Sequence, residues 1–397
     1  MGSTKSQRLR RELVRQLGDS GQLRSAPVRD AFLAIPREVF IPGFAAKNRF
    51  EDVYKPQEAI PTRLDDMGIS ISSSSAPSIM AIMLEQLALE PGHKVLEIGT
   101  GTGYNAALLK HIVGPRGRVT SIDIDGRNTR EAKTHLKRAG SSVRVVTGDG
   151  RKGVTAGAPY DRIIATVSSI NVPRAWFRQT RIGGRIVVPL NVSTSIDTPQ
   201  LSVGFEKLSN ALRSVDVSTA GFMGMRETQD SPSAFVRHFA VQLRGGGEPD
   251  RLLAIYPGEI LKRFDSAQAS RVLAWTLNPE RSRKVALTGP EWWTFAVFMA
   301  LTVPEEHLFI GPGLIDANAK SLAYLMPGRE GTTLHSSGGV WAERKILGAL
   351  ERWTQRGRPS VDRLRIEATY GGSMPPRGRT STRGECTLGF HWTRGAS

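Results

Sequence analysis

One stretch of the sequence, KVLEIGTGTGYNAALLKHIVGPRGRVTSIDID, constrains the fold of this chain more than any other. It begins with an apolar segment, Lys94 to Ile98, and continues into Gly99, Gly101 and Gly103. The apolar residues that follow recur at helical spacing, and a second apolar segment then ends at Asp123. Glycines suit such a turn because the backbone bends sharply and leaves no side chains between itself and a flat ligand. The stretch therefore predicts a strand, a glycine turn, a helix and a second strand.

The glycine spacing distinguishes between two kinds of nucleotide site. It is Gly-x-Gly-x-Gly here, whereas dinucleotide sites use Gly-x-Gly-x-x-Gly and offer a helix N-terminus to a pyrophosphate. Glu97 directly precedes the glycines, and its carboxylate would lie unfavourably beside phosphate. Asp123 follows the glycines by roughly 20 residues, where an acidic side chain accepts hydrogen bonds from ribose hydroxyls. Together with Gly148-Asp149-Gly150 after the next strand, the pattern favours a binding site for S-adenosylmethionine over an ordinary strand-to-helix turn with incidental glycines.

Strands and helices alternate along this part of the chain. We expect strands at 94–98, 118–122, 143–147, 161–165 and 185–189, helices at 103–113, 127–139 and 173–179, and a turn at Gly183-Gly184. Such alternation demands parallel strands with helical crossovers. The predicted fold is α/β, with a doubly wound, mainly parallel sheet of the class I S-adenosylmethionine-dependent methyltransferase type. Ligands bind beyond the carboxyl ends of such strands, where Glu97, Asp123, Asp149 and Thr166 lie.

A series of motifs extends on both sides of the glycine turn. VRDAFLAIPREVFIP, YKPQEAIP and SSAP precede it, and VVTGDGRKG, APYDRIIATVS and RIGGRIVVPL follow it. In this order the motifs resemble the protein-L-isoaspartate O-methyltransferase family over roughly residues 7 to 190. The resemblance implies that S-adenosylmethionine is bound and S-adenosylhomocysteine released. The expected cofactor-binding residues are Glu97, Gly99, Thr100, Gly101, Thr102, Gly103, Asp123, Ile124, Asp149, Gly150 and Thr166.

The serine run Ser72 to Ser75 is the expected position of the substrate. Read alone, it also suits a loop and N-cap before a helix predicted over Ser78 to Leu87. In the resembling family the serine of Ser-x-Pro lies beside substrate and methyl donor. Ser75 occupies that position and is the expected catalytic residue. Because serines also precede it, the alignment with the motif could be shifted by one residue. The expected substrate-binding residues are Ser74, Ala76, Pro77, Val167, Ser168 and Arg226. The chain departs from the family at Ser78 and in the loop 167–171, and both departures concern the substrate.

The chain is expected to divide into three parts. These are an N-terminal helical subdomain (1–65, with helices at 7–17 and 28–35), a methyltransferase domain (66–226) and a C-terminal α+β extension (227–397) that recognises the substrate. Family members usually end soon after the strand at 185–189. Phe-x-x-Met-Arg at 222–226 with such an extension resembles the subgroup that accompanies ribosomally synthesised, modified peptides, namely lanthipeptides, lasso peptides and graspetides. The Gly245–Gly247, Gly331–Gly339 and PPRGRTSTRGE segments are expected to be loops.

Charge and composition limit the partners. The net charge of +17 indicates an acidic partner such as a precursor peptide, although the spread of the arginines also fits a genome that favours arginine. We expect no membrane segment, a cytoplasmic location and no bound metal. Cys386 is the one cysteine, which excludes an intramolecular disulfide. The tryptophans of the extension either line a peptide groove or, for most of them, fill a core.

Four functions agree with these features. The first is an O-methyltransferase that esterifies an Asp side chain of a ribosomally synthesised peptide, before or after its cyclisation, and so leads to a succinimide (aspartimide) or isoaspartate. The second is isoaspartate repair, which the motifs support and the extension opposes. The third is an RNA methyltransferase, which the positive charge allows. However, ATVSS stands where adenine-N6 methyltransferases have an Asn/Asp-Pro-Pro-Tyr motif. Nucleic acid is therefore not the expected partner. The fourth is a non-enzymatic protein, which the intact glycine motif opposes.

Overall fold

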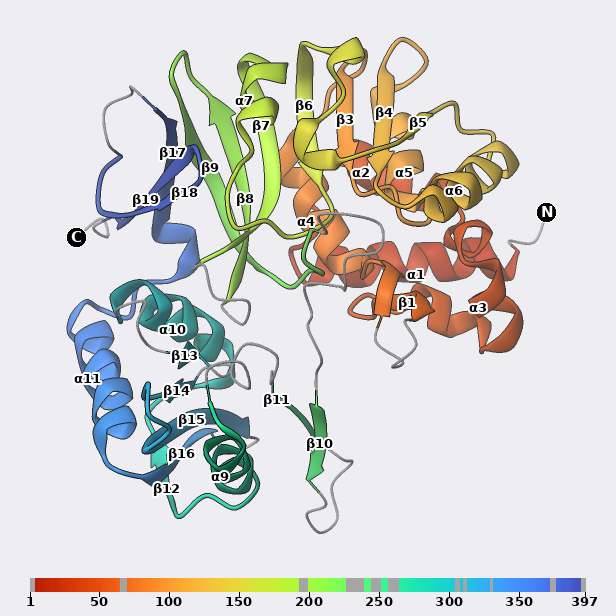
Figure 1. Cartoon of the computed structure of the whole chain (residues 1–397). Helices are drawn as coiled ribbons and strands as arrows, with labels where there is room; N and C mark the ends of the chain where they lie inside the picture. The colour runs from red at the N-terminus through yellow and green to blue at the C-terminus, as the bar shows by residue number, and fades with distance from the viewer. Residues whose placement is uncertain are drawn as a thin grey trace.

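The fold is built on a ten-stranded sheet, which lies at the top of Figure 1. The computed structural model describes residues 4–64, 70–192, 199–225, 239–243, 251–255, 264–303, 308–309, 313–328, 331–371 and 376–393. The strand order is β18-β19-β17-β9-β8-β7-β6-β3-β4-β5. Half of this sheet is parallel and half is antiparallel, and the two halves meet at β7.

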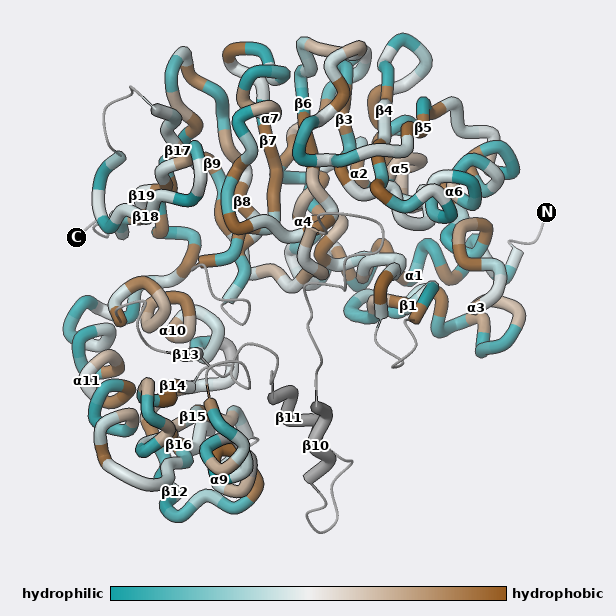
Figure 2. Tube along the Cα trace, in the orientation of Figure 1, coloured by the Kyte–Doolittle hydropathy of each residue, from teal (hydrophilic) through white to brown (hydrophobic). Residues whose placement is uncertain are grey.

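The parallel half follows the predicted alternation. Its strands are β3 (Lys94–Ile98), β4 (Arg118–Asp123), β5 (Arg144–Thr147), β6 (Tyr160–Ala165) and β7 (Thr180–Asn191). The helices between and before them are α4 (Pro77–Leu87), α5 (Tyr104–Val113), α6 (Gly126–Arg138) and α7 (Arg174–Gln179). Parallel pairing of β7-β6-β3-β4-β5 confirms the predicted fold class. Buried apolar side chains fill these strands, which are brown in Figure 2, whereas α6 is largely teal.

One turn predicted in this region is wrong. Gly183 and Gly184 lie inside β7, which continues through them. The pairing with β6 shifts here, because Thr180 lies opposite Tyr160 whereas Arg185 lies opposite Arg162. Gly183 has φ of +71°, a value that glycine adopts without strain. The glycines therefore form an irregularity in a long strand instead of a turn.

The antiparallel half joins segments far apart in the sequence. It consists of β8 (Gln200–Lys207), β9 (Ala211–Ala220), β17 (Leu364–Tyr370), β19 (Cys386–Trp392) and β18 (Arg379–Arg383). β17 pairs directly with β9, so the end of the chain completes the sheet of the methyltransferase core. The basic segment PPRGRTSTRGE, expected to be a loop, contains β18 in register with β19. Pairing with a neighbour has outweighed a composition that disfavours a strand.

A second sheet lies below the first in Figure 1. Its order is β12-β16-β15-β14-β13, and all its pairs are antiparallel. The strands are β12 (Arg281–Val285), β13 (Leu308–Phe309), β14 (Gly313–Ile315), β15 (Ser321–Gly328) and β16 (Gly331–Gly338). With α9 (Ser266–Leu277), α10 (Gly289–Thr302) and α11 (Trp341–Gln355) they form what we call the C-terminal unit. The Gly331–Gly339 segment, expected to be a loop, is thus mostly strand β16, paired on both sides.

Two further strands lie among the described residues of the segment 227–397. β10 (Phe239–Leu243) and β11 (Arg251–Ile255) form an antiparallel pair of their own. The expected loop Gly245–Gly247 lies outside the described residues. The described residues of the segment 227–397 are therefore distributed over the C-terminal unit, this small pair and the edge of the core sheet.

Specific contacts fix the C-terminal unit against the core sheet. The α10 side chains from Phe295 to Met299 are almost fully buried, and all of them except Ala296 belong to one core cluster with residues of β7, β8 and β17. The Phe298 ring lies 6.3 Å from that of Trp392 in β19. Arg379 of β18 donates to the carbonyls of Leu301 and Val303 at the end of α10.

Among the described residues no helix is long and apolar enough to cross a membrane.

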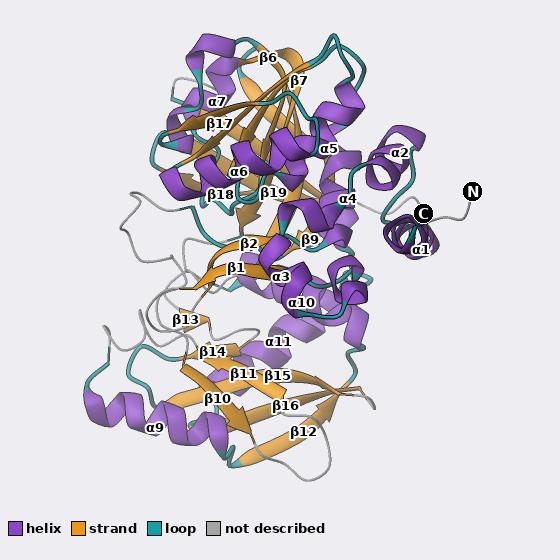
Figure 3. Ribbon diagram, turned by 90° about the vertical axis from the view of Figure 1, so that its right-hand side faces the viewer, coloured by secondary structure: helices purple, strands orange, loops and turns teal. Residues whose placement is uncertain are grey.

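The N-terminal part covers one end of the parallel half, as Figure 3 shows from the side. It contains α1 (Lys5–Asp19), α2 (Ala26–Ala34), α3 (Pro42–Lys47) and the antiparallel pair β1 (Ile60–Leu64) and β2 (Ser70–Ser74). Thr4 and Gln7 form a reciprocal capping box that begins α1. Buried residues of α1, α2, α4 and α5 form a single apolar cluster. This packing positions β2, which carries most of the serine run.

Candidate functional site

A cavity of about 1170 Å³ lies where β2, the glycine turn and the C-terminal unit meet. The expected site residues that line it are Ser74, Ser75, Ala76, Gly99, Thr100, Gly101, Thr102, Asp123, Ile124, Gly150, Thr166 and Val167. The expected residues that do not line it are Pro77, Glu97, Gly103, Asp149 and Ser168. Arg226 lies outside the described residues. The structure thus brings most of the expected residues together around one space.

The glycine turn approaches the cavity with its backbone. Gly99 has φ of +95°, and a Cβ there would lie 2.6 Å from the Thr166 hydroxyl, too close for any side chain. That hydroxyl donates to the Gly99 carbonyl at 2.7 Å. A Cβ on Gly101 would lie 3.5 Å from the Ser73 carbonyl across the cavity. The turn therefore leaves a cradle of bare backbone between β3, β6 and the serine run.

Asp123 is fixed at the carboxyl end of β4. Its Oδ2 accepts from the Gly101 amide at 2.9 Å and its Oδ1 from the Asp125 amide at 2.9 Å. Asn128 donates more weakly, at 3.3 Å to each oxygen. A carboxylate has about four acceptor sites, of which the two backbone amides occupy two, and the two longer contacts from Asn128 are those that a ligand hydroxyl could replace. The geometry suits a carboxylate that holds the glycine turn and accepts hydrogen bonds from a ligand diol.

Glu97 lies behind the cavity instead of lining it. Its side chain is fully buried, and it accepts from the Asn105 amide at 2.9 Å and from the Ser121 hydroxyl. Ser121 also contacts the Thr100 hydroxyl at 2.6 Å, which links Glu97 to the glycine turn. Burial raises the pKa of Glu97 to about 7, although the hydrogen bonds from Ser121 and Asn105 oppose the shift. Glu97 therefore lies in position to orient the turn and does not line the cavity.

Glu97→Gln is expected to change how stability depends on pH. A solvent-exposed glutamate has a pKa of 4.5, whereas the pKa of Glu97 in the folded chain is about 7, so between these values the folded chain holds more protons than the unfolded chain. The stability that protonated Glu97 contributes to the folded chain is therefore lost as the pH rises through this window, by roughly 1.4 kcal/mol for each unit by which its pKa is raised. Gln keeps the shape without the charge. The stability of Glu97→Gln relative to wild type, from urea unfolding, should rise between pH 5 and pH 7; a difference independent of pH would contradict the assignment.

The serine run is held by a buried cation that the sequence analysis missed. Arg37 has no solvent exposure, and its guanidinium donates to the carbonyls of Ser75 at 2.9 Å and Val53 at 2.7 Å. It also contacts the carbonyl and hydroxyl of Ser74. Burial lowers the pKa of Arg37 to about 10, so it stays charged at neutral pH. The motif PREVF contains Arg37, but nothing in the pattern indicated that it reaches the serines.

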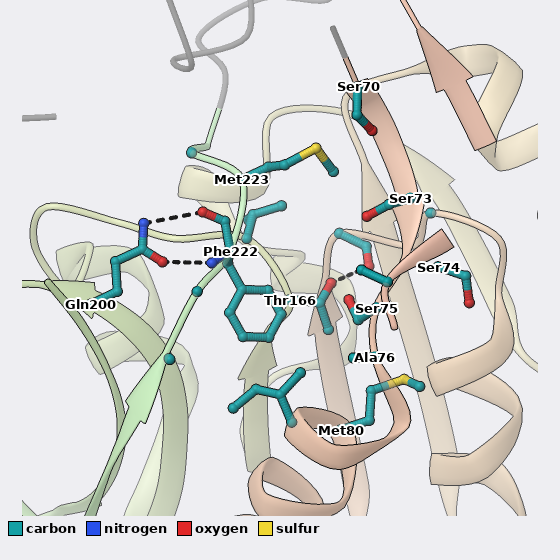
Figure 4. Close-up of a pocket in the computed structure, with 18 of the residues that line it drawn as sticks. Ser70, Ser73, Ser74, Ser75, Ala76, Met80, Thr166, Gln200, Phe222 and Met223 are labelled. Carbon is teal, nitrogen blue, oxygen red and sulfur yellow. Dashed lines mark hydrogen bonds between the residues drawn. The ribbon is translucent and has the colours of Figure 1, made fainter. Parts of the chain in front are cut away.

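The segment Phe222–Met225 forms the opposite side of the cavity, as Figure 4 shows. Gln200 of β8 holds this segment, because its amide donates to the Phe222 carbonyl at 3.1 Å and accepts from the Phe222 amide at 2.6 Å. The backbone of Ser168 pairs with Met223 and Met225. Ser168 is therefore an anchor for this segment and not part of the cavity lining. Gln200 was not expected from the sequence, since it lies in an ordinary strand.

The wall of the cavity is almost free of charge. Among the lining residues in the described part of the chain, Asp123 alone is charged at neutral pH. The positive charge of the protein therefore lies elsewhere. A groove for nucleic acid would need Lys and Arg side chains along the phosphate path. The lining disfavours RNA as the ligand of this cavity.

The chain is similar to known proteins over the part that carries the glycine turn. The family described as protein-L-isoaspartate(D-aspartate) O-methyltransferase matches residues 7–223. A protein-L-isoaspartate O-methyltransferase of Ignicoccus hospitalis is 38% identical over 182 residues, which are 46% of this chain and 81% of that protein. One of Thermotoga maritima is 40% identical over 173 residues, 43% of this chain and 53% of that protein. Residues 7–223, which the family matches, contain the glycine turn, the serine run and Phe222.

A solved structure extends the likeness to the C-terminal part. A protein-L-isoaspartate O-methyltransferase structure aligns with a TM-score of 0.52 and 26% identity. The alignment covers 91% of this chain and 97% of that one. A C-terminal part beyond the methyltransferase core is therefore not peculiar to this chain.

Proposed function

We propose that this chain, which belongs to the protein-L-isoaspartate(D-aspartate) O-methyltransferase family, esterifies an Asp side chain in a ribosomally synthesised peptide. The observation that carries the proposal is one cavity with three walls: the glycine turn, the serine run, and the C-terminal unit. Its volume exceeds the ~300–1,000 Å³ of a typical small-molecule pocket, so it offers room for more than a cofactor. Wild-type substrate choice would then depend on the segment 227–397.

The residues of the cavity fit S-adenosylmethionine. The bare backbone of Gly99 to Gly101 would hold its amino-acid end, Asp123 would accept from the ribose hydroxyls, and Ile124 and Gly150 would border the adenine. S-adenosylmethionine supplies a methyl group on a sulfonium, which is transferred to a nucleophile. The substrate carboxylate titrates near ~4 and is ionised at neutral pH, so no general base is required. The work of the protein is then to align the two reactants.

Ser75 is the residue proposed to orient the carboxylate. It lines the cavity directly after β2, on the side that faces the glycine turn, and its backbone carbonyl is held by Arg37. Its hydroxyl would donate to one carboxylate oxygen while the other attacks the methyl carbon. The O–CH₃ bond forms as the S–CH₃ bond breaks, and the negative carboxylate and positive sulfonium become a neutral ester and a neutral thioether.

The ester then activates its own peptide. The backbone nitrogen of the following residue loses its proton to solvent and attacks the ester carbonyl. The C–OCH₃ bond then breaks, the methoxide takes up a proton from solvent and leaves as methanol, and a five-membered succinimide remains. Water opens this ring at either carbonyl to give aspartate or isoaspartate. A repair enzyme starts from isoaspartate, whereas a tailoring enzyme starts from aspartate, and the same ring lies on both routes.

The family match and the solved structure with a comparable C-terminal part favour isoaspartate repair as a second candidate function. The two candidates differ in the substrate, not in the cofactor chemistry. Ser78 and Val167, at which the chain departs from the motifs of the family, both line the cavity, and these departures support the tailoring function. The acidic nature of the precursor and a cytoplasmic location stay predictions.

The two functions are separated by a matched pair of peptides. The full-length protein is given S-adenosylmethionine and a short peptide that carries either Asp or isoaspartate at the same place, and the products are followed by mass. The tailoring function requires the Asp peptide to gain the mass of one methylene and then to lose a molecule of water relative to the start. Efficient methylation of the isoaspartyl peptide alone would favour repair. Enzyme heated to unfolding is the control for spontaneous ring closure.

A further inference from the structure

The C-terminal unit places aromatic side chains in the wall of the methyl-transfer cavity. Trp292 and Trp293 of α10 and Tyr324 and Met326 of β15 line the same space as Ser75. We propose that Trp293, supported by Trp292, forms a subsite for one apolar side chain of the peptide that carries the target carboxylate. This inference rests on the proposed function, because it identifies the substrate class of the same site.

Trp293 differs from the rest of its helix. The α10 residues from Phe295 to Met299 are at most 2% exposed, whereas Trp293 is 45% exposed. A large ring left in the wall of a cavity has apolar surface that a ligand can bury. Exposed aromatic residues in otherwise packed pockets commonly supply most of the binding free energy of an interface.

Trp292 holds the Trp293 ring in place. The two rings meet edge to face, with centroids 5.0 Å apart and planes at 86°. Trp292 is itself fixed, since its indole N–H donates to the Leu325 carbonyl at 3.3 Å. The helix is tied to the core sheet through Phe298 with Trp392 and through Arg379. Trp293 is therefore part of a rigid wall and loses little freedom when a ligand binds.

The lining selects the chemistry of the occupant. An acidic side chain placed against these rings would be desolvated without an opposite charge, because Asp123, the one charged lining residue in the described part of the chain, is itself an anion. Met223, Met225 and Met326 also line the cavity and adapt readily to apolar groups of different shape. An aliphatic or aromatic side chain near the target carboxylate fits this wall, and an acidic one does not.

The experiment uses synthetic peptides and the full-length protein. Each peptide holds one reacting residue in a Gly/Ser background, with a single Leu moved through the positions on either side. Two series are made, one with Asp and one with isoaspartate. Leu at the matching position should raise kcat/KM by about tenfold or more over Ala, mainly through KM, as expected for burial of one apolar side chain. Trp293→Ala should abolish this preference, and Trp293→Phe should retain part of it.

Trp341→Ala is the matched control, because Trp341 lies in the same unit but does not line this cavity. It should leave the Leu preference unchanged. If Trp293→Ala keeps the full preference, or if no Leu position matters in either series, the subsite does not exist. The isoaspartyl series tests the subsite even if Asp is not methylated, so the two proposals fail separately. If neither series reacts, binding is measured instead: the Leu peptides are titrated into the protein with S-adenosylhomocysteine present, and indole fluorescence is followed. Trp293→Phe is the reference variant. A fluorescence change in the wild type that Trp293→Phe lacks supports the subsite, and no such difference overturns it.

Discussion

Ser75→Ala is expected to lower kcat/KM for the peptide by about ten- to a hundredfold while leaving the affinity for S-adenosylmethionine nearly unchanged. A hydrogen bond to a charged group contributes about 1.5–3 kcal/mol, and this one would be made to the reacting carboxylate. The backbone of Ser75 is fixed through its carbonyl by Arg37, so the loss of the hydroxyl should leave the strand in place. Initial rates and calorimetric binding of S-adenosylmethionine measure the two effects separately.

Ser73→Ala is the control for this prediction. Ser73 belongs to the same run and lines the same cavity, but it is two residues from the proposed donor. It should change the rate little. If Ser73→Ala proves the more sensitive variant, the register of the motif is shifted; if neither variant affects the rate, the serine run is only a structural element.

Asp123→Ala should weaken the binding of S-adenosylmethionine by about ten- to a hundredfold. The carboxylate is proposed to accept from the ribose hydroxyls, and such charged hydrogen bonds contribute about 1.5–3 kcal/mol. It also holds the Gly101 amide at 2.9 Å, so its removal loosens the turn that would hold the other end of the cofactor. Calorimetry with S-adenosylmethionine and with S-adenosylhomocysteine should show the same loss for both.

Two variants control for indirect effects of this change. Asp123→Asn retains the shape and one acceptor oxygen, so a smaller loss is expected. Asp149→Ala removes a carboxylate that binds Arg151 and does not line the cavity, and it should also cost less than Asp123→Ala. An unchanged affinity in Asp123→Ala would remove Asp123 from the cofactor site.

The parallel half of the sheet could be predicted because its pattern is local. Strands β3 to β6 agree with the expected ranges within about a residue, since apolar runs bounded by glycines specify both the period and the ends. The positions of the glycine turn and Asp123 at the cavity could also be predicted, because they follow from a single strand–turn–helix unit. The place of Ser75 required the resemblance to a known family.

The remainder depends on contacts between distant segments. β18 and β16 were expected to be loops, because Gly, Ser, Thr and Arg predominate in them, but each has a partner strand that satisfies its backbone. Glu97 was expected to touch the cofactor, whereas its partners Asn105 and Ser121 hold it behind the turn. No spacing indicated that Arg37 would reach Ser75, that Gln200 would hold Phe222, or that Trp293 would face the site.

The measurement that tests the central claim most directly asks which kind of bond the transferred methyl group enters. The full-length protein, S-adenosylmethionine with a labelled methyl group and the matched Asp and isoaspartyl peptides are incubated together, and the labelled product is treated with mild base. A carboxyl ester loses its label as methanol, whereas a methyl group on nitrogen or carbon stays with the peptide. We predict that the label on a reactive peptide is released by base and that Ser75→Ala strongly reduces its incorporation. A label that resists base, or no transfer to either peptide, would contradict the assignment of this cavity to carboxyl methylation.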